Sequence, residues 1–119
     1  MHYYSGLGRQ TAELHSLILN HPNIYEHPKG HSKYTLRYRT SCGSEIAVEK
    51  RAGIPLLYFT RSLAEGRING LNPDWLPASL KGRNSNLNTL ETFRNQSLAR
   101  LRVTTLYTAR KALDACVSR

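Results

Sequence analysis

Apolar and polar residues alternate regularly from Lys33 to Thr40. The apolar side chains, at every second position, are Tyr34, Leu36 and Tyr38. A period of two is typical of a strand that turns one face to the core. A polar turn signal follows at 41–44, and apolar residues recur at alternate positions within 45–49. This pattern predicts a β-hairpin.

The alternation also predicts the register of the hairpin. Tyr38 is expected opposite Ile46 on the apolar face, and Arg39 opposite Glu45 on the other face. The same register pairs Leu36 with Val48 and Thr35 with Glu49. A third apolar run over 54–60 contains a proline at position 55, which suits only the start of a strand or an edge. Together the three runs predict an antiparallel meander.

Helical spacing appears before and after this meander. Residues 8–20 carry apolar side chains at i, i+3 and i+4, and Pro22 disfavours helical geometry beyond them. A short helix is expected from Ser62, whose capping-box partner is Glu65, to about residue 70.

A last, long helix is predicted from about Asn88 to about Cys116. Its apolar residues fall in one arc of the helix when they are projected at about 100° per residue. The residues expected on its outer face are Arg100, Tyr107 and Lys111, with Arg110 toward one border. This helix would cover the sheet with its apolar side.

The predicted elements form one α+β domain over residues 1–119, in the order α-β-β-β-α-α. A three-stranded antiparallel sheet is expected to pack against the N-terminal helix and the long C-terminal helix. With 119 residues, 39% of them hydrophobic, the chain is long enough to bury its own core. No apolar run approaches the ~20 residues of a membrane span, and the N-terminus lacks the layout of a secretion signal. We therefore expect a cytoplasmic protein that does not enter a membrane.

The charge of the chain indicates which class of partner the predicted domain binds. The net charge is +9, from 17 Lys and Arg against eight acids. Residues 1–28 are slightly acidic, so the excess begins after them. Most of the cations are Arg, whose planar fork suits phosphate and carboxylate oxygens. Such a balance indicates a partner that is a polyanion or an acidic surface.

Three sets of basic residues are the candidate binding surfaces. The first lies on the predicted strands and the turns around them: Lys29, Lys33, Arg37, Arg39, Lys50 and Arg51. The second is Lys81 and Arg83, in a loop of small polar residues that can bring backbone N–H groups near phosphates. The third is on the outer face of the last helix: Arg100, Tyr107, Arg110 and Lys111. Arg37 and Arg39 are expected to face solvent, and Glu45 partly neutralises Arg39.

Candidate catalytic and metal-binding residues are weak in this sequence. His21, His27 and His31 lie close together in the chain, but Pro28 and Gly30 prevent a helix from presenting the last two on one face. A nuclease would need carboxylates and a lysine at strand ends, and Glu49 and Lys50 point to opposite faces because they are adjacent. We therefore expect no catalytic residue, no metal and no cofactor.

The sequence thus predicts a small, basic, non-enzymatic protein that binds DNA or RNA by its phosphates. The alternative is a small inhibitor or adaptor, of the kind that phages and mobile elements encode, which binds a protein or nucleoprotein through the same basic surface. Trp75, Phe93 and Tyr107 would then be candidate anchors, because exposed aromatic side chains tend to carry interface energy.

Overall fold

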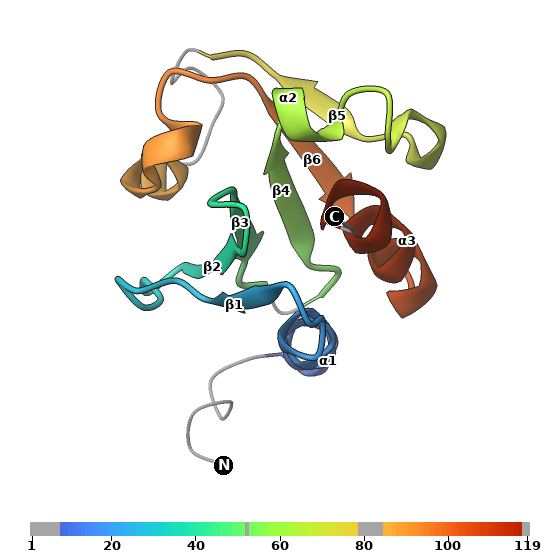
Figure 1. The fold of residues 1–119 in the computed structure, drawn as a ribbon. Helices are drawn as coiled ribbons and strands as arrows, with labels where there is room; N and C mark the ends of the chain where they lie inside the picture. Colours follow the sequence, from blue (N-terminus) through green and yellow to red (C-terminus); the bar gives the residue numbers. More distant parts are fainter. Residues whose placement is uncertain (1–7, 52, 79–84, 118–119) are drawn as a thin grey trace.

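A six-stranded antiparallel sheet forms the centre of the protein in the computed structural model (Figure 1). The structure describes residues 8–51, 53–78 and 85–117. The strands are β1 (Ile24–Glu26), β2 (Thr35–Thr40), β3 (Glu45–Glu49), β4 (Leu56–Thr60), β5 (Asp74–Leu76) and β6 (Leu98–Arg102). Their order across the sheet is β1-β2-β3-β4-β6-β5. The α+β class is confirmed, whereas the prediction of three strands is wrong.

The hairpin of β2 and β3 has the predicted register. Tyr38 is paired with Ile46, and Arg39 with Glu45. Leu36 and Val48 also face each other. The apolar alternation is sufficient to predict this register because a slip of one residue would turn the whole apolar set to the other face.

Two helices cover one face of the sheet: α1 (Arg9–Leu19) and α3 (Leu106–Val117). Figure 1 shows them on the same side, next to β1 and β6 respectively. Leu14 and Ile18 of α1 and Leu113 of α3 pack with the inward residues of the strands, among them Leu57 and Phe59. Burial of these apolar side chains stabilises the sheet-on-helix layer. None of the helices in the described part of the chain is long and apolar enough to cross a membrane.

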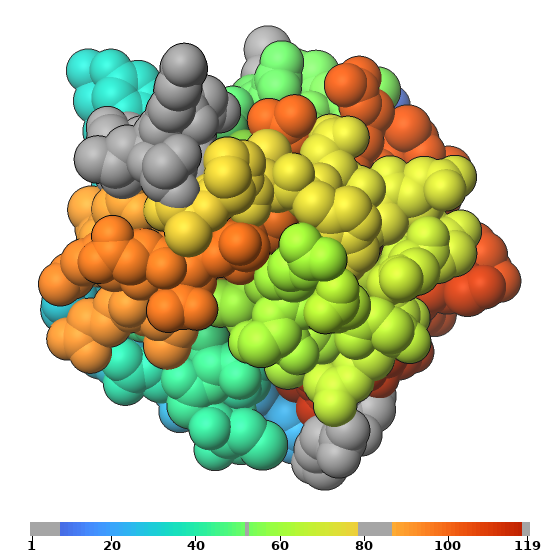
Figure 2. Space-filling view, turned by 90° about the horizontal axis from the view of Figure 1, so that it is seen from above, coloured from blue at the N-terminus to red at the C-terminus, as the bar shows by residue number. Residues whose placement is uncertain are grey.

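The other face of the sheet is covered by short 3₁₀ turns, η3 (Ser85–Thr89) and η4 (Glu91–Phe93). Leu87, Leu90 and Phe93 of these turns are buried against Ala47 and Tyr58 of the sheet. Seen from above (Figure 2), the orange segment that contains these turns lies beside the light green and yellow residues of α2 (Arg61–Ala64), η2 (Asn69–Leu71) and β5.

The long helix predicted over 88–116 is therefore wrong. The same residues form η4, strand β6 and the shorter helix α3. Asn95 lies between η4 and β6 with φ 58°, a left-handed conformation that interrupts a right-handed helix. Residues Leu98 to Arg102 then pair with β4 on one side and with β5 on the other.

Candidate nucleic-acid interface

The structure divides the first predicted basic set among three places. Lys33, Lys50 and Arg51 lie at the end of the sheet where β2 begins and β3 ends. Arg39 lies near the opposite end of β2, and Lys29 lies in the loop after β1. Lys29, Lys33 and Arg51 are exposed, whereas Lys50 and Arg39 are half-buried.

Arg37 does not face solvent, contrary to the prediction. Its side chain is buried, and it donates hydrogen bonds to the carbonyl oxygens of Gly30 (2.7 Å) and Lys29 (3.2 Å) and to Oγ1 of Thr89 (3.1 Å). η3, which carries Thr89, covers this part of the sheet face. Arg37 thus ties the loop of residues 29–30 to η3 and is not presented to a partner.

Arg39 borders a buried pair between His27 and Glu45. His27 Nε2 hydrogen-bonds the Glu45 carboxylate, and Thr92 donates its N–H (2.9 Å) and its hydroxyl (2.8 Å) to the same group. Arg39 Nη2 lies 3.8 Å from this carboxylate. Burial raises the pKa of Glu45, but the hydrogen bonds from Thr92 and His27 outweigh it and hold that pKa below its ordinary value. The group is a structural connection that neutralises Arg39 in part.

The third predicted set is also separated. Arg100 lies on β6, and its guanidinium donates two hydrogen bonds of 3.2 Å to Oδ2 of Asp74 on β5. Tyr107, Arg110 and Lys111 are exposed on α3, and the Lys111 ammonium lies 5.4 Å from the centre of the Tyr107 ring. The second set, Lys81 and Arg83, lies outside the described residues.

Two residues that belong to none of the three predicted basic sets join Lys33, Lys50 and Arg51 at one end of the molecule. Arg9 begins α1, and Thr11 in the same turn donates a hydrogen bond of 3.0 Å to the Arg51 carbonyl. Arg102 ends β6 opposite Leu56, which in turn pairs with Glu49.

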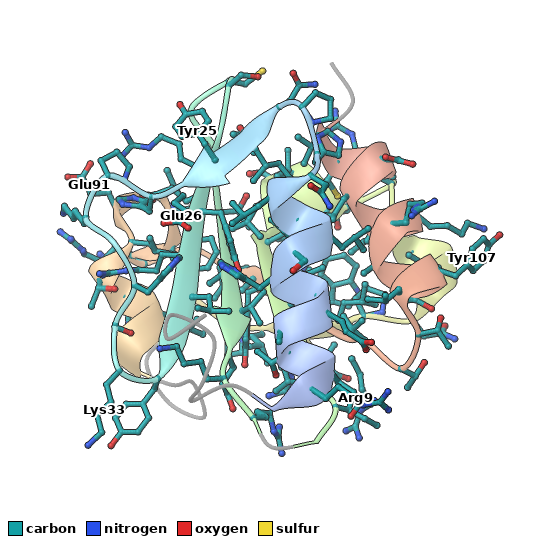
Figure 3. All side chains as sticks on the ribbon, turned by 90° about the horizontal axis from the view of Figure 1, so that it is seen from below. Arg9, Tyr25, Glu26, Lys33, Glu91 and Tyr107 are labelled. Atoms are coloured by element: carbon teal, nitrogen blue, oxygen red, sulfur yellow. The ribbon has the colours of Figure 1, made fainter. Side chains whose placement is uncertain are left out.

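We call this surface the basic end; its residues are Arg9, Lys33, Lys50, Arg51 and Arg102. A hollow of about 220 Å³, lined by Arg9, Pro55 and Val103 among others, connects the start of α1 to the connection after β6. In Figure 3, Lys33 and Arg9 both lie toward the lower edge, and Tyr25 lies at the opposite edge.

The positive field of the basic end is only partly neutralised. Glu13 lines the same hollow as Arg9, and Glu26 and Lys50 both act electrostatically on His15 and His31. Glu49 lies 3.9 Å from Arg51 and also accepts a hydrogen bond of 2.9 Å from the Tyr58 hydroxyl. No side chain caps the first turn of α1, so the positive end of the helix dipole adds to the field of Arg9.

Two acids elsewhere are engaged with neighbours. Glu65 pairs with Arg61 (2.7 Å), and Asp114 lies 3.7 Å from His21. Within the described residues, the cations that lie in no ion pair are Arg9, Lys29, Lys33, Arg37, Lys50, Arg67, Arg94, Arg102, Arg110 and Lys111. Eight of these ten side chains are exposed, whereas Arg37 is buried and Lys50 is half-buried, so much of the positive charge is at the surface.

A cluster of His15, Glu26 and His31 offers one ligand-type atom per residue, all within 4.8 Å of one another. Burial lowers the pKa of both histidines, so both rings are neutral at neutral pH. His31 Nδ1 accepts the N–H of Arg37 (2.9 Å), and therefore the ring proton is on Nε2, 3.7 Å from the Glu26 carboxylate. To bind a cation, Nε2 would have to lose this proton and Nδ1 would have to give up its hydrogen bond from Arg37, since a metal-bound histidine donates from its other nitrogen. This geometry does not fit a three-ligand metal site.

His15 completes the same cluster from α1. Its Nδ1 is 2.6 Å from the Tyr38 hydroxyl, and both side chains are fully buried. The cluster therefore connects α1, β2 and the loop before β2 inside the protein. Of the three histidines considered from the sequence, only His31 belongs to it; His27 bonds Glu45, and His21 lies elsewhere.

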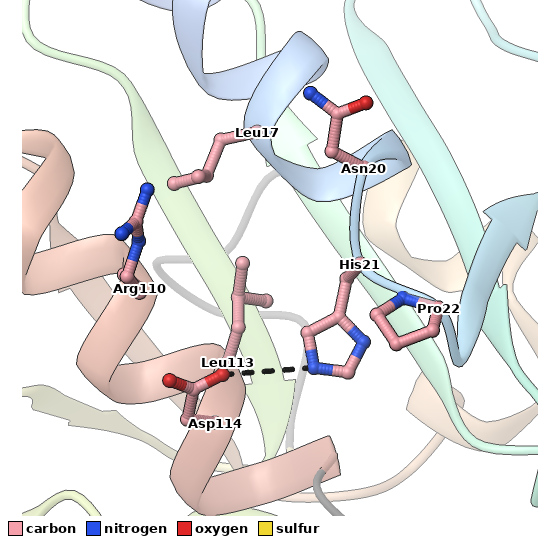
Figure 4. Close-up of a pocket in the computed structure, with 7 residues that line it drawn as sticks. All are labelled: Leu17, Asn20, His21, Pro22, Arg110, Leu113 and Asp114. Carbon is pink, nitrogen blue, oxygen red and sulfur yellow. Dashed lines mark ion pairs between the residues drawn. The ribbon is translucent and has the colours of Figure 1, made fainter.

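His21 lines a pocket of about 220 Å³ between the end of α1 and α3 (Figure 4). Leu17 and Leu113 form its apolar wall, and Arg110 and Asp114 lie at its α3 side. The only ion pair drawn there joins His21 to Asp114. This pocket places Arg110 beside an acid, away from the basic end.

The sequence carries a weak signal for the missed residues. Arg100, Leu101, Arg102 and Val103 alternate polar and apolar side chains, as a strand would. Arg9 stands at the start of the predicted first helix, but nothing in the local sequence indicates that this start lies against Arg51. No protein-family model, curated protein or solved structure matches the chain.

Proposed function

We propose that the protein binds nucleic acid through the phosphates at its basic end and has no catalytic activity of its own. The observation that carries this proposal is the meeting of five cations from α1, β6 and the shared end of β2 and β3, of which Arg51 alone lies in an ion pair within the described part of the chain. Arg9, Lys33 and Arg102 among them are exposed and lie in no ion pair with a described residue, and such cations are the groups that bind phosphate oxygens.

The proposal of a non-enzymatic role is supported by the burial of the histidines near carboxylates. The side chains of His21, His27 and His31 are 11%, 1% and 9% exposed. An acid or base must reach the proton that it transfers, at hydrogen-bond distance or through one water. These rings do not offer that access to a macromolecular substrate.

The alternative, an adaptor or inhibitor that binds a protein, draws support from two exposed aromatic residues. Trp75 is 37% exposed and Tyr107 is 68% exposed. Each lies near a cation, Arg61 and Lys111 respectively. Phe93, the third expected anchor, is fully buried in the core beneath η4 and is excluded.

The test is a fluorescence-anisotropy titration of labelled oligonucleotides against the wild type and two double variants. Lys33→Glu with Arg102→Glu should weaken binding and make the dependence of log Kd on log salt shallower by about 0.7–0.9 per lost phosphate contact. The control, Arg67→Glu with Arg94→Glu, removes the same charge from exposed positions after β4 and before β6. Equal loss in both double variants would reject the basic end, and no binding at low salt would reject the function.

A further inference from the structure

We propose that the basic end takes single-stranded nucleic acid, with Tyr34 as the side chain on which a base stacks. This inference rests on the proposed function and adds to it the class of ligand. Tyr34 precedes β2 and is 52% exposed, although the alternate residues Leu36 and Tyr38 that follow it are buried. The apolar alternation therefore begins, just before β2, with an aromatic ring that is not buried in the core.

The backbone of Tyr34 is held although half of the residue is exposed to solvent. Its carbonyl accepts a hydrogen bond of 2.9 Å from the N–H of Lys50. Ser32, two residues earlier, accepts a hydrogen bond from Thr35 N–H at its side chain (3.1 Å) and from Lys50 Nζ at its carbonyl (2.9 Å). A stacking platform needs this property, because a ring on an ordered backbone loses little conformational entropy on binding.

One cation lies over the ring, and a second one follows the end of β3, bonded to Tyr34 through its backbone. The Lys33 ammonium lies 5.3 Å from the centre of the Tyr34 ring, and Lys50 is joined to Tyr34 and Ser32 as described. Single strands bind to proteins by this combination of a positively charged path for the backbone and aromatic faces for the bases. Lys33 and Lys50 would hold phosphates on either side of a base that lies on Tyr34.

A duplex suits this surface less well than a single strand. In a duplex the faces of each base are covered by neighbouring bases, so the Tyr34 ring has no base face on which to stack. The β2–β3 turn over 41–44, which projects from the opposite end of β2, carries no cation with which to enter a groove. The cations of the basic end stand at strand ends and at the start of α1 instead.

The test compares Tyr34→Ala with Tyr25→Ala in the full chain. Tyr25 is a matched control, because it is 48% exposed and lies on β1 opposite Arg39, away from the basic end. Labelled single strands of DNA and of RNA, about 12 nucleotides long, are titrated by anisotropy at low salt. Tyr34→Ala should weaken binding about 5- to 150-fold, Tyr34→Phe should bind like the wild type, and Tyr25→Ala should bind within twofold.

Competition with unlabelled strands completes the test. The single strand should displace the probe at a lower concentration than the duplex of the same sequence. The inference is overturned if the duplex competes equally well, or if Tyr34→Ala and Tyr25→Ala bind alike. In either case binding that still depends on Lys33 and Arg102 would leave the proposed function intact, whereas no binding by the wild type would remove both.

Discussion

Glu45 joins three segments that are distant in the sequence. The carboxylate stands on β3, and it accepts hydrogen bonds from His27 after β1 and from Thr92 in η4. Arg39 on the neighbouring strand lies 3.8 Å away. The cross-strand neighbour Arg39 was predictable from the alternation of β2, whereas the bonds to His27 and Thr92 depend on loop positions that no local pattern encodes.

Glu45→Gln should lower the free energy of unfolding at pH 7 by about 1–3 kcal/mol, because buried donors lose a charged acceptor. The pKa of Glu45 is held below its ordinary value of 4.5 in the folded protein, so its contribution is complete above that value and is lost as pH falls through the lowered pKa. The free energies of unfolding of the wild type and of Glu45→Gln, measured in urea, should therefore converge as the pH is lowered.

Glu65→Gln, on an exposed pair with Arg61, is the control and should change stability by less than about 1 kcal/mol. A constant difference between wild type and Glu45→Gln down to low pH would contradict this account.

The cluster of His15, Glu26 and His31 gives a second test at the scale of residues. Since His31 Nδ1 accepts the Arg37 N–H, zinc would have to break that hydrogen bond before His31 Nε2 could bind it. We expect a small excess of Zn²⁺ to leave the melting temperature unchanged, in the wild type and in His31→Gln alike. A rise in the wild type that is absent from His31→Gln would show that the cluster binds metal, because a ligand of the native state stabilises it.

At the scale of elements, β6 explains both the largest error and why Arg102 was missing from the predicted site. Leu98, Leu101 and Leu106 fit a helical arc as well as they fit a strand followed by a helix, since short apolar runs do not determine the period. Pairing with β4 and β5 decided the outcome, and such long-range pairing is not encoded locally. The hairpin of β2 and β3 was predictable because its alternation and its turn agree. Lys33, Lys50 and Arg51 follow from that hairpin, but Arg102 could be placed beside them only once β6 was known.

Substitution of Asn95 tests whether this segment is a continuous helix or the observed turn and strand, because the two predict opposite changes in stability for Asn95→Ala. In a continuous helix, Asn95→Ala would stabilise the protein, because Ala is the better helix former. In the structure Asn95 has φ 58°, and therefore Asn95→Ala should destabilise it by about 1–2 kcal/mol while Asn95→Gly is neutral or stabilising. Urea denaturation of the two variants measures both values. If the Ala variant is more stable than the Gly variant, the result would contradict the left-handed conformation at Asn95 and support the continuous helix.

At the scale of the whole molecule, the +9 charge has two opposing consequences. Exposed cations in no ion pair repel one another and lower the stability of the folded state, and the same cations attract phosphates. The few ion pairs between exposed groups, such as Arg61 with Glu65, contribute little to stability. Salt screens both the repulsion and the attraction, with a Debye length of about 10 Å at 0.1 M.

Salt should therefore move stability and binding in opposite directions. Between about 0.02 and 0.2 M NaCl, the melting temperature of the free protein should rise because salt screens the repulsion among the exposed Lys and Arg side chains. Over the same range the affinity for a single-stranded oligonucleotide should fall steeply, since the release of the same counterions gains less entropy in a saltier solution. Thermal unfolding and anisotropy on one salt series measure the two trends. The variant Lys33→Glu with Arg102→Glu should show a smaller rise and a shallower fall, because two positive charges at one end have been replaced by two negative charges. A melting temperature that decreases with salt would mean that ion pairs, and not the unneutralised cations, dominate the electrostatics of the fold.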